Sequence, residues 1–187
     1  MSERYKAAMR RDQSLPKIWL ISDERNDAML EGALKRMPRG SGFIYRHYHL
    51  DDPGRFDRFQ SLRRVAEARG QTIILSDSGL TAREWGAHGT YGPPRANWPR
   101  RRELIHLATV HDMRELRLAN SLGSDAALIS PVFPTRSHSD GHVLGAVRFL
   151  HLARHALMPV IALGGMDRHR ASFLGWDRWA AIDGLSG

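Results

Sequence analysis

The stretch PVIALGGMD, at residues 159–167, decides how this chain folds. It opens with the apolar run 159–163, which has the length of a β-strand, and continues directly into Gly164 and Gly165. A strand without polar positions is typical of a parallel sheet that helices cover on both faces. A glycine pair at its end lets backbone N–H groups come close to a ligand. The stretch therefore predicts a buried parallel strand that ends at a candidate binding site.

Seven further β-rich runs accompany this one. They lie at residues 17–22, 42–48, 72–76, 87–91, 104–110, 126–133 and 179–183. The segments between the runs are typical of helices, and alternating strands and helices predict right-handed βαβ units. Eight such strands close into a barrel more readily than they form an open sheet. We therefore predict an α/β fold, a compact (β/α)₈ TIM barrel.

Periodicity supports the predicted helices. Apolar residues recur at helical spacing after Pro53, and Asp112 followed by Glu115 predicts a capping box at the start of another helix. A third helix is predicted from one apolar stripe, formed by Ala146, Phe149, Leu150, Ala153 and Leu157.

The barrel is expected to be short of helices, because about 250 residues are typical of this fold and the chain has 187. Segment 93–103 leaves room for only a short fourth helix, and the last helix is expected to be missing. We predict that the exposed flank is covered by the N-terminal stretch or by a second copy in a homo-oligomer. No linker divides the chain, so we expect a single domain over residues 1–187, of which 1–14 form an N-terminal extension.

The composition limits the class of protein. Hydrophobic residues make up 42% and charged residues 26% of the chain, as in globular proteins. No run approaches the roughly 18 apolar residues of a membrane span, and no apolar stretch behind the N-terminus predicts a signal peptide. With no cysteine there is no disulfide, thiolate metal site or cysteine nucleophile. We expect a cytoplasmic protein.

The formal net charge of +8 leaves a nucleic-acid-binding protein open as an alternative. The one dense basic patch consists of Arg95, Arg100, Arg101 and Arg102 around Trp98. Such a patch fits a solvated loop, a phosphate-facing loop or a nucleic-acid surface. No zinc-finger spacing, RNA-binding signature or helix-turn-helix pattern supports the last, so we expect no nucleic-acid partner.

Candidate site residues follow the predicted strands, at the end of the barrel where this fold places catalytic groups. After the sixth strand, Thr135, Ser137 and His138 offer two hydroxyls and an imidazole to an anionic ligand, although two prolines also fit a plain stiff turn. Gly164 and Gly165 end the seventh strand, where this fold usually binds phosphate.

Three further strand ends carry polar groups. Ile182 and Asp183 end the eighth strand, beside the expected phosphate site. Asp77 ends the third strand, as a magnesium ligand, a proton acceptor or a helix cap. His111 follows the fifth strand, in either a catalytic or a structural role.

Three segments together resemble the thiamine-phosphate synthase family and its thiazole-tautomerase relatives. They are GSDAALISPVFPTRSH at 123–138, PVIALGGMD at 159–167 and WAAIDGL at 179–185, and the resemblance runs from Lys17 to Leu185. It implies a barrel that joins an aminopyrimidine methyl pyrophosphate to a thiazole phosphate and releases pyrophosphate with the help of Mg²⁺. Small phosphorylated pyrimidine and thiazole substrates are the partners it implies.

The family pattern is only partly kept in the first half of the chain. The family has the pattern Gln-x-Arg-x-Lys at the second strand, and this chain keeps only its arginine, as Arg46. The family's Asn-Asp pair after the third strand is Ser76-Asp77 in this chain. The second metal carboxylate aligns near Arg95, and Ser-x-His after the fifth strand becomes Thr109-Val110-His111.

The second half is also altered. Thr-x-Thr-Lys becomes Thr135-Arg136-Ser137-His138, and Gly164 and Gly165 match the family. Asp183 replaces a phosphate-binding serine, and it would repel phosphate unless an arginine pairs with it or its carboxylate is turned away. Pro131 stands where the tautomerase branch has its catalytic histidine, so that activity is not favoured.

The resemblance implies a role for each matching residue. Arg46 and His138, with Arg136, would bind pyrophosphate, and Asp77 would bind a Mg²⁺ ion that is held weakly or only together with pyrophosphate. Thr109, Thr135 and Ser137 would offer hydroxyls, Gly164 and Gly165 would hold the thiazole phosphate beside Ile182 and Asp183, and His111 would orient groups or exchange protons. A tautomerase-like or catalytically silent binder of a phosphorylated heterocycle remains the alternative.

Overall fold

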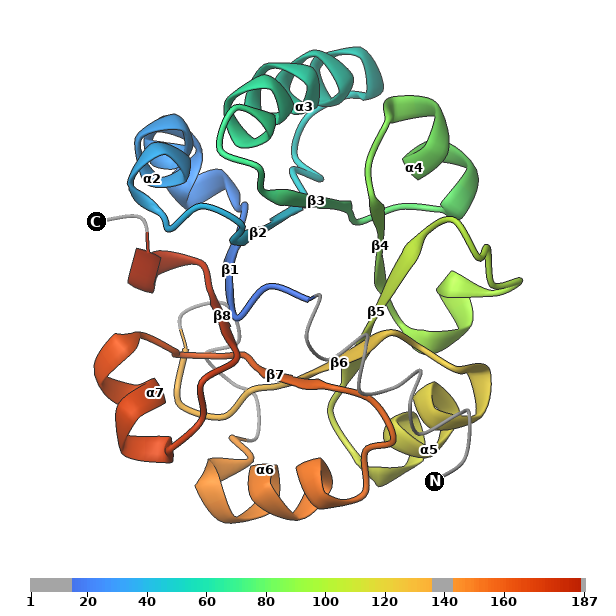
Figure 1. Ribbon diagram of the computed structural model, residues 1–187, viewed down its shortest axis with the longest axis vertical. Coiled ribbons are helices and arrows are strands. Elements are labelled where there is room, and N and C mark those ends of the chain that lie inside the picture. Colours follow the sequence, from blue (N-terminus) through green and yellow to red (C-terminus); the bar gives the residue numbers. More distant parts are fainter. Residues whose placement is uncertain (1–14, 136–142, 186–187) are drawn as a thin grey trace.

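The computed structural model describes residues 15–135 and 143–185, which form a closed barrel of parallel strands in the order β1 to β8 (Figure 1). The strands are β1 (Ile18–Ile21), β2 (Gly42–Tyr45), β3 (Thr72–Leu75), β4 (Gly89–Gly92), β5 (Ile105–Val110), β6 (Ala126–Ile129), β7 (Val160–Ala162) and β8 (Trp179–Ala181). Each overlaps one predicted run, so the predicted eight-stranded barrel is confirmed. Most strands end earlier than predicted, because the apolar runs continue into buried loops such as that of Val132.

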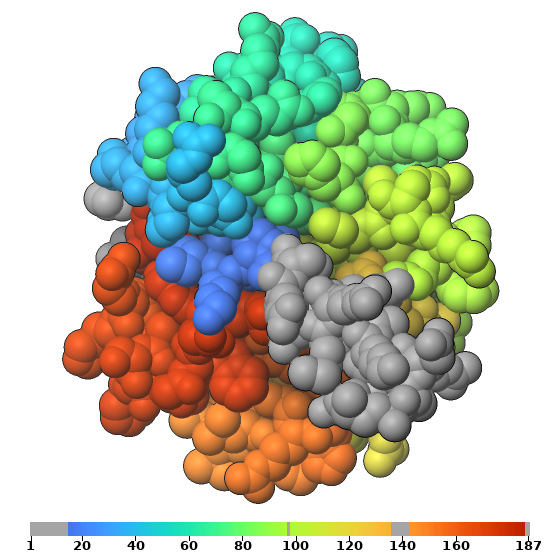
Figure 2. Space-filling model, viewed as in Figure 1, coloured from blue at the N-terminus to red at the C-terminus, as the bar shows by residue number. Residues whose placement is uncertain are grey.

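Helices surround the barrel on its outside (Figures 1 and 2). They are η1 (Glu24–Met29), α2 (Leu30–Arg36), α3 (Asp52–Glu67), α4 (Gly79–Trp85), η2 (Pro94–Asn97), α5 (Met113–Leu122), α6 (Gly145–Arg154), α7 (Arg168–Leu174) and η4 (Asp183–Leu185). The short 3₁₀ helix η2 is the reduced fourth helix that the sequence predicts. In the described part of the chain, β8 is followed only by the single turn η4.

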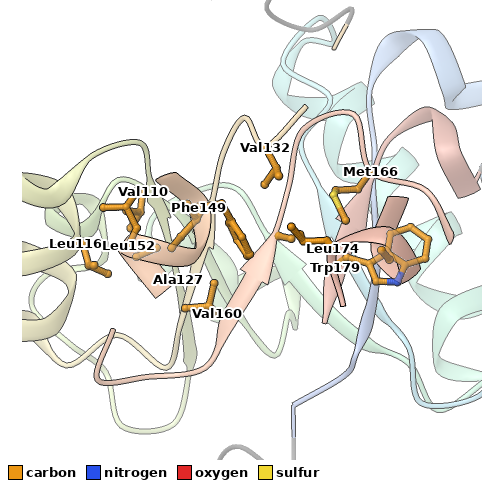
Figure 3. Packing of buried hydrophobic residues seen from close by; sticks show 14 of the residues in the cluster. Val110, Leu116, Ala127, Val132, Phe149, Leu152, Val160, Met166, Leu174 and Trp179 are labelled. Atoms are coloured by element: carbon orange, nitrogen blue, oxygen red, sulfur yellow. The ribbon is translucent and has the colours of Figure 1, made fainter. Parts of the chain in front are cut away.

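The barrel interior is filled by side chains that point inward from the strands. Trp19, with no exposed surface, is the largest of them, and a Cβ at Gly42 of the neighbouring strand would overlap its indole ring. Glycine at position 42 is therefore needed to make room for the tryptophan. A second apolar layer lies between the strands and helices α5, α6 and α7, where Phe149, Val160 and Leu174 pack (Figure 3).

Two local predictions need correction. On α6 the core side chains are Phe149 and Leu152, whereas Leu150 is exposed and Leu157 lies beyond the end of the helix. The predicted capping box of α5 forms only in half. The Asp112 carboxylate accepts from the Glu115 backbone N–H at 2.8 Å, but the Glu115 carboxylate accepts from the N–H of His111 instead of that of Asp112.

The cover of the barrel flank stays a prediction. The N-terminal stretch proposed for it, residues 1–14, lies outside the described residues, and homo-oligomer formation is not tested. Among the helices of residues 15–135 and 143–185, none is long and apolar enough to cross a membrane.

Candidate active site

A cavity of about 1500 Å³ opens at the carboxyl ends of the strands, and all eight strand ends contribute to its wall. The predicted site residues that line it are Arg46, Thr109, His111, Thr135, Gly164, Gly165, Ile182 and Asp183. Asp77 and Arg95 are described but do not line it. Arg136, Ser137 and His138 lie outside the described residues. Residues far apart in the sequence therefore meet at one end of the barrel.

Arg46 is the cation that follows β2 in the cavity wall. Its backbone N–H donates to Oγ of Ser22 at 2.8 Å, and its carbonyl accepts from Nε of Arg55 at 2.9 Å. Its guanidinium carbon lies 5.6 Å from the centre of the Tyr48 ring, and within the described part of the chain the group forms no ion pair. The backbone is thus held on both sides while the charge remains available to an anion.

Behind Arg46, a buried chain of hydrogen bonds joins Ser22, His47 and Asp27. Nδ1 of His47 lies 2.8 Å from Oγ of Ser22, and Nε2 lies 2.8 Å from Oδ1 of Asp27. Burial lowers the pKa of His47 and keeps its ring neutral. Burial alone would raise the pKa of Asp27, but hydrogen bonds from His47 and Arg58 hold it below its ordinary value.

These protonation states fix the direction of the chain of hydrogen bonds. Nε2–H donates to the Asp27 carboxylate, so Nδ1 accepts the Ser22 hydroxyl proton, and Oγ accepts from the Arg46 N–H. Ser22 has no exposed surface and does not line the cavity. The Ser–His–Asp arrangement therefore positions Arg46 and does not form a nucleophile.

Asp77 is bound by donors of the chain itself. Its Oδ2 accepts from Nη1 of Arg55 at 2.7 Å, and its Oδ1 accepts from the Ser78 N–H at 2.7 Å. Burial alone would raise the pKa of Asp77, but these bonds hold it below the ordinary value. A carboxylate with both oxygens so engaged, one of them by a cation, does not fit a ligand of a resident Mg²⁺ ion.

The turn after β7 has the backbone that the glycine pair predicts. Gly164 has a φ of +93° and Gly165 of +60°. A Cβ at Gly164 would lie 2.6 Å from Cα of Pro131, and one at Gly165 would overlap the carbonyl oxygen of Pro134. The close approach of the loop after β6 thus requires glycine at both positions. Among the described residues, neither glycine N–H donates a hydrogen bond.

Asp183, at the neighbouring end of β8, has an arginine partner. Oδ2 lies 3.5 Å from Nη1 of Arg25, which also pairs with Asp23 at 2.7 Å through Nε. The Asp183 side chain is 52% exposed. The sequence predicts that Asp183 repels phosphate unless an arginine pairs with it or its carboxylate is turned away, and Arg25 of η1 provides the pairing.

His111 lies at the mouth of the cavity, next to Thr109 of β5. Its backbone N–H and its Nδ1 both contact Oε2 of Glu115, at 2.7 and 2.9 Å. Glu115 therefore orients the imidazole, and Nε2 is the ring nitrogen left for a ligand. The geometry is compatible with the predicted role in orienting groups or exchanging protons, which stays a prediction.

Two tyrosines complete the wall near Arg46. The Ser76 hydroxyl donates to the Tyr91 carbonyl at 3.2 Å and accepts from the hydroxyl of Tyr48. Burial raises the pKa of Tyr91 to about 12, so its phenol keeps its proton. Tyr48 stands at the position of the family's lysine, where it cannot supply a positive charge, and its one hydroxyl proton is donated to Ser76. Nothing in the local sequence patterns of Tyr91 or Arg55 points to a site, so neither residue could be predicted from the sequence.

The basic segment between β4 and β5 is partly used inside the protein. Nη2 of Arg100 lies 2.6 Å from Oδ1 of Asp125, a carboxylate that also accepts from the N–H of His106. Arg95 is exposed on η2, outside the cavity wall. The expected position of Arg95 near a metal site therefore receives no support from the geometry.

Comparison with known proteins identifies one family. The family model described as thiamine monophosphate synthase (TMP-TENI) matches residues 18–183. The chain is 29% identical over 139 residues to a thiamine-phosphate synthase of Lactococcus lactis subsp. lactis (strain IL1403), covering 70% of this chain and 62% of that one. It is 28% identical over 158 residues to that of Lactococcus lactis subsp. cremoris (strain MG1363), covering 79% and 71%.

Solved structures agree on the fold. A thiamine phosphate pyrophosphorylase from Pyrococcus furiosus has a TM-score of 0.78 at 22% identity, covering 95% of this chain and 90% of that one. An aldolase/citrate lyase family protein from Burkholderia cenocepacia has a TM-score of 0.62 at 13% identity, covering 97% and 93%. At these identities the likeness shows the barrel alone. The family match over nearly the whole barrel shows that the chain belongs to the thiamine monophosphate synthase family.

Proposed function

We propose that the protein joins an aminopyrimidine methyl pyrophosphate to a thiazole phosphate, giving thiamine phosphate and pyrophosphate. The observation that carries the proposal is the cavity, which Arg46 and the glycine pair of the β7 turn both line within a family-matched barrel. Arg46 offers a guanidinium to one anion, and the glycine pair offers backbone N–H groups to another. Two phosphorylated substrates need such an arrangement of two anion-binding ends.

The reaction breaks the C–O bond between the pyrimidine methylene and pyrophosphate, and the electron pair leaves with pyrophosphate. The lone pair of the thiazole nitrogen then forms the new C–N bond. Negative charge develops on the leaving group, and stabilising it is the main task of the protein. Arg46 binds the pyrophosphate in this proposal, together with Arg136 and His138, and Ser137 offers a hydroxyl.

The other predicted residues hold the acceptor. The N–H groups of Gly164 and Gly165 bind the thiazole phosphate, and Thr109 and Thr135 offer hydroxyls. Arg25 offsets part of the repulsion between Asp183 and that phosphate, because the two side chains form an ion pair at 3.5 Å. Asn26 donates through Nδ2 to the carbonyls of Ile21 and Ile182, which ties the ends of β1 and β8 together.

Apolar side chains line the reaction space between the two ends. Ile21, Leu163 and Ile182 are part of the cavity wall. A pyrimidine methyl cation reacts with any nearby water, so these apolar side chains favour attack by the thiazole. Because Asp77 does not fit a resident metal ligand, a Mg²⁺ ion would enter only as the counter-ion of the pyrophosphate substrate.

The test is an assay with both substrates, in which thiamine phosphate and pyrophosphate are quantified. The proposal predicts equal amounts of the two products and none when either substrate is left out. Pyrophosphate without thiamine phosphate would mean that the protein ionises the pyrimidine but has no thiazole site. Tight binding of both substrates without either product would instead support the silent binder. A cytoplasmic location stays a prediction from the composition.

A further inference from the structure

Arg55, in the first turn of α3, is a buried cation that the proposed reaction does not yet use. Arg55 is 7% exposed, and its guanidinium donates to three oxygens at the ends of two strands. Nε donates to the Arg46 carbonyl at 2.9 Å, Nη2 to the Ser76 carbonyl at 2.9 Å and Nη1 to the Asp77 carboxylate at 2.7 Å. One carboxylate and two carbonyl oxygens therefore surround the guanidinium, and oxygens of these kinds are also the ligands that divalent cations take in proteins.

We propose that Arg55 is the resident cation of this site, standing at Asp77 where a divalent metal ion would otherwise bind. The inference deepens the proposed function, on which it rests for its role in catalysis. The fixed guanidinium supplies positive charge behind Arg46, and it excludes a metal ion from Asp77. The protein therefore needs no metal of its own at this strand end.

Three aromatic side chains surround the guanidinium of Arg55 and stabilise it in this position. Its guanidinium carbon lies 5.3 Å from the ring centre of Trp85, 5.5 Å from that of Tyr48 and 6.0 Å from that of Tyr45. Aromatic faces attract a guanidinium and shield it from water. A metal ion at Asp77 would have to displace this group or remain beside it, against the repulsion between two cations.

The same contacts connect Arg55 to the cavity. The carbonyl that it holds belongs to Arg46, whose N–H is held by Ser22. The Ser76 residue that it holds also contacts Tyr48 and Tyr91 through its hydroxyl. Arg55 is therefore a positioning residue, because it acts on the cavity through these residues and does not line the wall itself.

The inference is tested by titrating the substrate-free protein with Mn²⁺, followed by electron paramagnetic resonance. The variants are Arg55→Met, Arg55→Lys and the double variant Arg55→Met with Asp77→Asn. We expect Arg55→Met to bind Mn²⁺ at least about tenfold more tightly than the wild type. Even in water, the repulsion between a unit charge and a divalent ion about 4 Å apart corresponds to a change in affinity of at least that size. The double variant should lose this binding.

Arg55→Lys is the matched control. It also loses the three-way hydrogen bonding but keeps the charge, so we expect it to bind Mn²⁺ as weakly as the wild type. Equal Mn²⁺ binding by the Met and Lys variants would overturn the inference, since the charge would then not be what excludes the metal. A folded Arg55→Met protein without new Mn²⁺ binding would overturn it as well.

A comparison of the wild type with Asp77→Asn keeps the inference testable if Arg55→Met does not fold. We expect the two proteins to bind Mn²⁺ equally weakly. Mn²⁺ binding by the wild type that is lost in Asp77→Asn would show that Asp77 holds a metal despite Arg55. No substrate is present in any of these titrations, so their outcome is separate from success or failure of the proposed synthase activity.

Discussion

Nδ1 of His47 lies 2.8 Å from Oγ of Ser22, and that oxygen accepts the backbone N–H of Arg46 at the same distance. His47 has a φ of +41°, a conformation that is uncommon for a residue other than glycine. The imidazole is buried and bound at both nitrogens. The placement of Arg46 in the cavity therefore depends on buried polar groups that a ligand never touches.

Replacement of Arg46 tests the pyrophosphate end of the cavity. We expect Arg46→Gln to lower kcat/KM for thiamine phosphate formation roughly 100- to 1,000-fold, the loss typical of removing one fixed donor to developing negative charge. Stability should change little, because the guanidinium forms no ion pair within the described residues. Arg83→Gln, an exposed arginine of α4 outside the cavity, is the control and should keep full activity. Equal activities of the two variants would show that Arg46 is not part of the active site.

Lowering the pH should destabilise the protein already at pH values above those at which its carboxylates titrate. Burial lowers the pKa values of His47 and His106, so the unfolded chain binds protons at these residues more readily than the folded one. Stability is full above the ordinary histidine pKa of about 6.5, and it falls as the pH drops from there towards the lowered folded values. We expect a smaller free energy of unfolding in urea at pH 5.5 than at pH 7.5.

The histidine variants identify the source of this pH dependence. His47→Gln should reduce the difference between the two pH values, and adding His106→Gln should reduce it further. Asp23, Asp27 and Asp77 have pKa values below the ordinary one, so their contribution is lost only below about pH 4. A wild-type protein that is equally stable at pH 5.5 and 7.5 would contradict the neutral, buried state of His47.

Adding even a methyl side chain in the turn after β7 should lower the stability of the protein. Gly165→Ala places a Cβ against the Pro134 carbonyl at a φ of +60°, so we expect a loss of about 2–4 kcal/mol in unfolding free energy. Gly175, at the end of α7, has a φ of +63° but nothing within 4 Å of an added Cβ. Gly175→Ala should cost only about 1 kcal/mol, from backbone strain alone. Equal losses in urea unfolding would show that the loops do not approach as closely as described.

Asp183 should weaken phosphate binding at the β8 end. Asp183→Ser removes a negative charge from the cavity wall, so we expect inorganic phosphate to bind up to about fivefold more tightly in calorimetry. Asp177→Ser is the matched control, because Asp177 is also exposed and paired, with Lys17, but precedes β8 at the other end of the barrel. Equal effects of both substitutions would mean that only net charge matters.

The fold could be predicted because its strands are nearly continuous apolar runs, separated by helices of ordinary periodicity. Strand ends were harder to place, since Val132 is as buried as the strand before it. Glycine at 164 and 165 predicted a close approach to a ligand, which stays a prediction. The structure shows in addition that the loop after β6 packs against both positions.

The polar contacts of the site could not be predicted in the same way. Arg55 contacts Asp77 from 22 residues away, and Arg25 contacts Asp183 from 158 residues away. Arginine in the first turn of a helix is typical of a solvated surface, so no local pattern distinguishes Arg55. Only the pairing of β2 with β3, which brings the ends of these two strands together, shows what Arg55 holds.

The most direct test of the proposed active site is a crystal structure of the protein with thiamine phosphate and pyrophosphate bound. We expect the pyrophosphate to contact the guanidinium of Arg46, and the thiazole phosphate to lie within hydrogen-bond distance of the N–H groups of Gly164 and Gly165. Both products bound outside the cavity at the carboxyl ends of the strands, or bound with Arg46 and the glycine pair untouched, would contradict it.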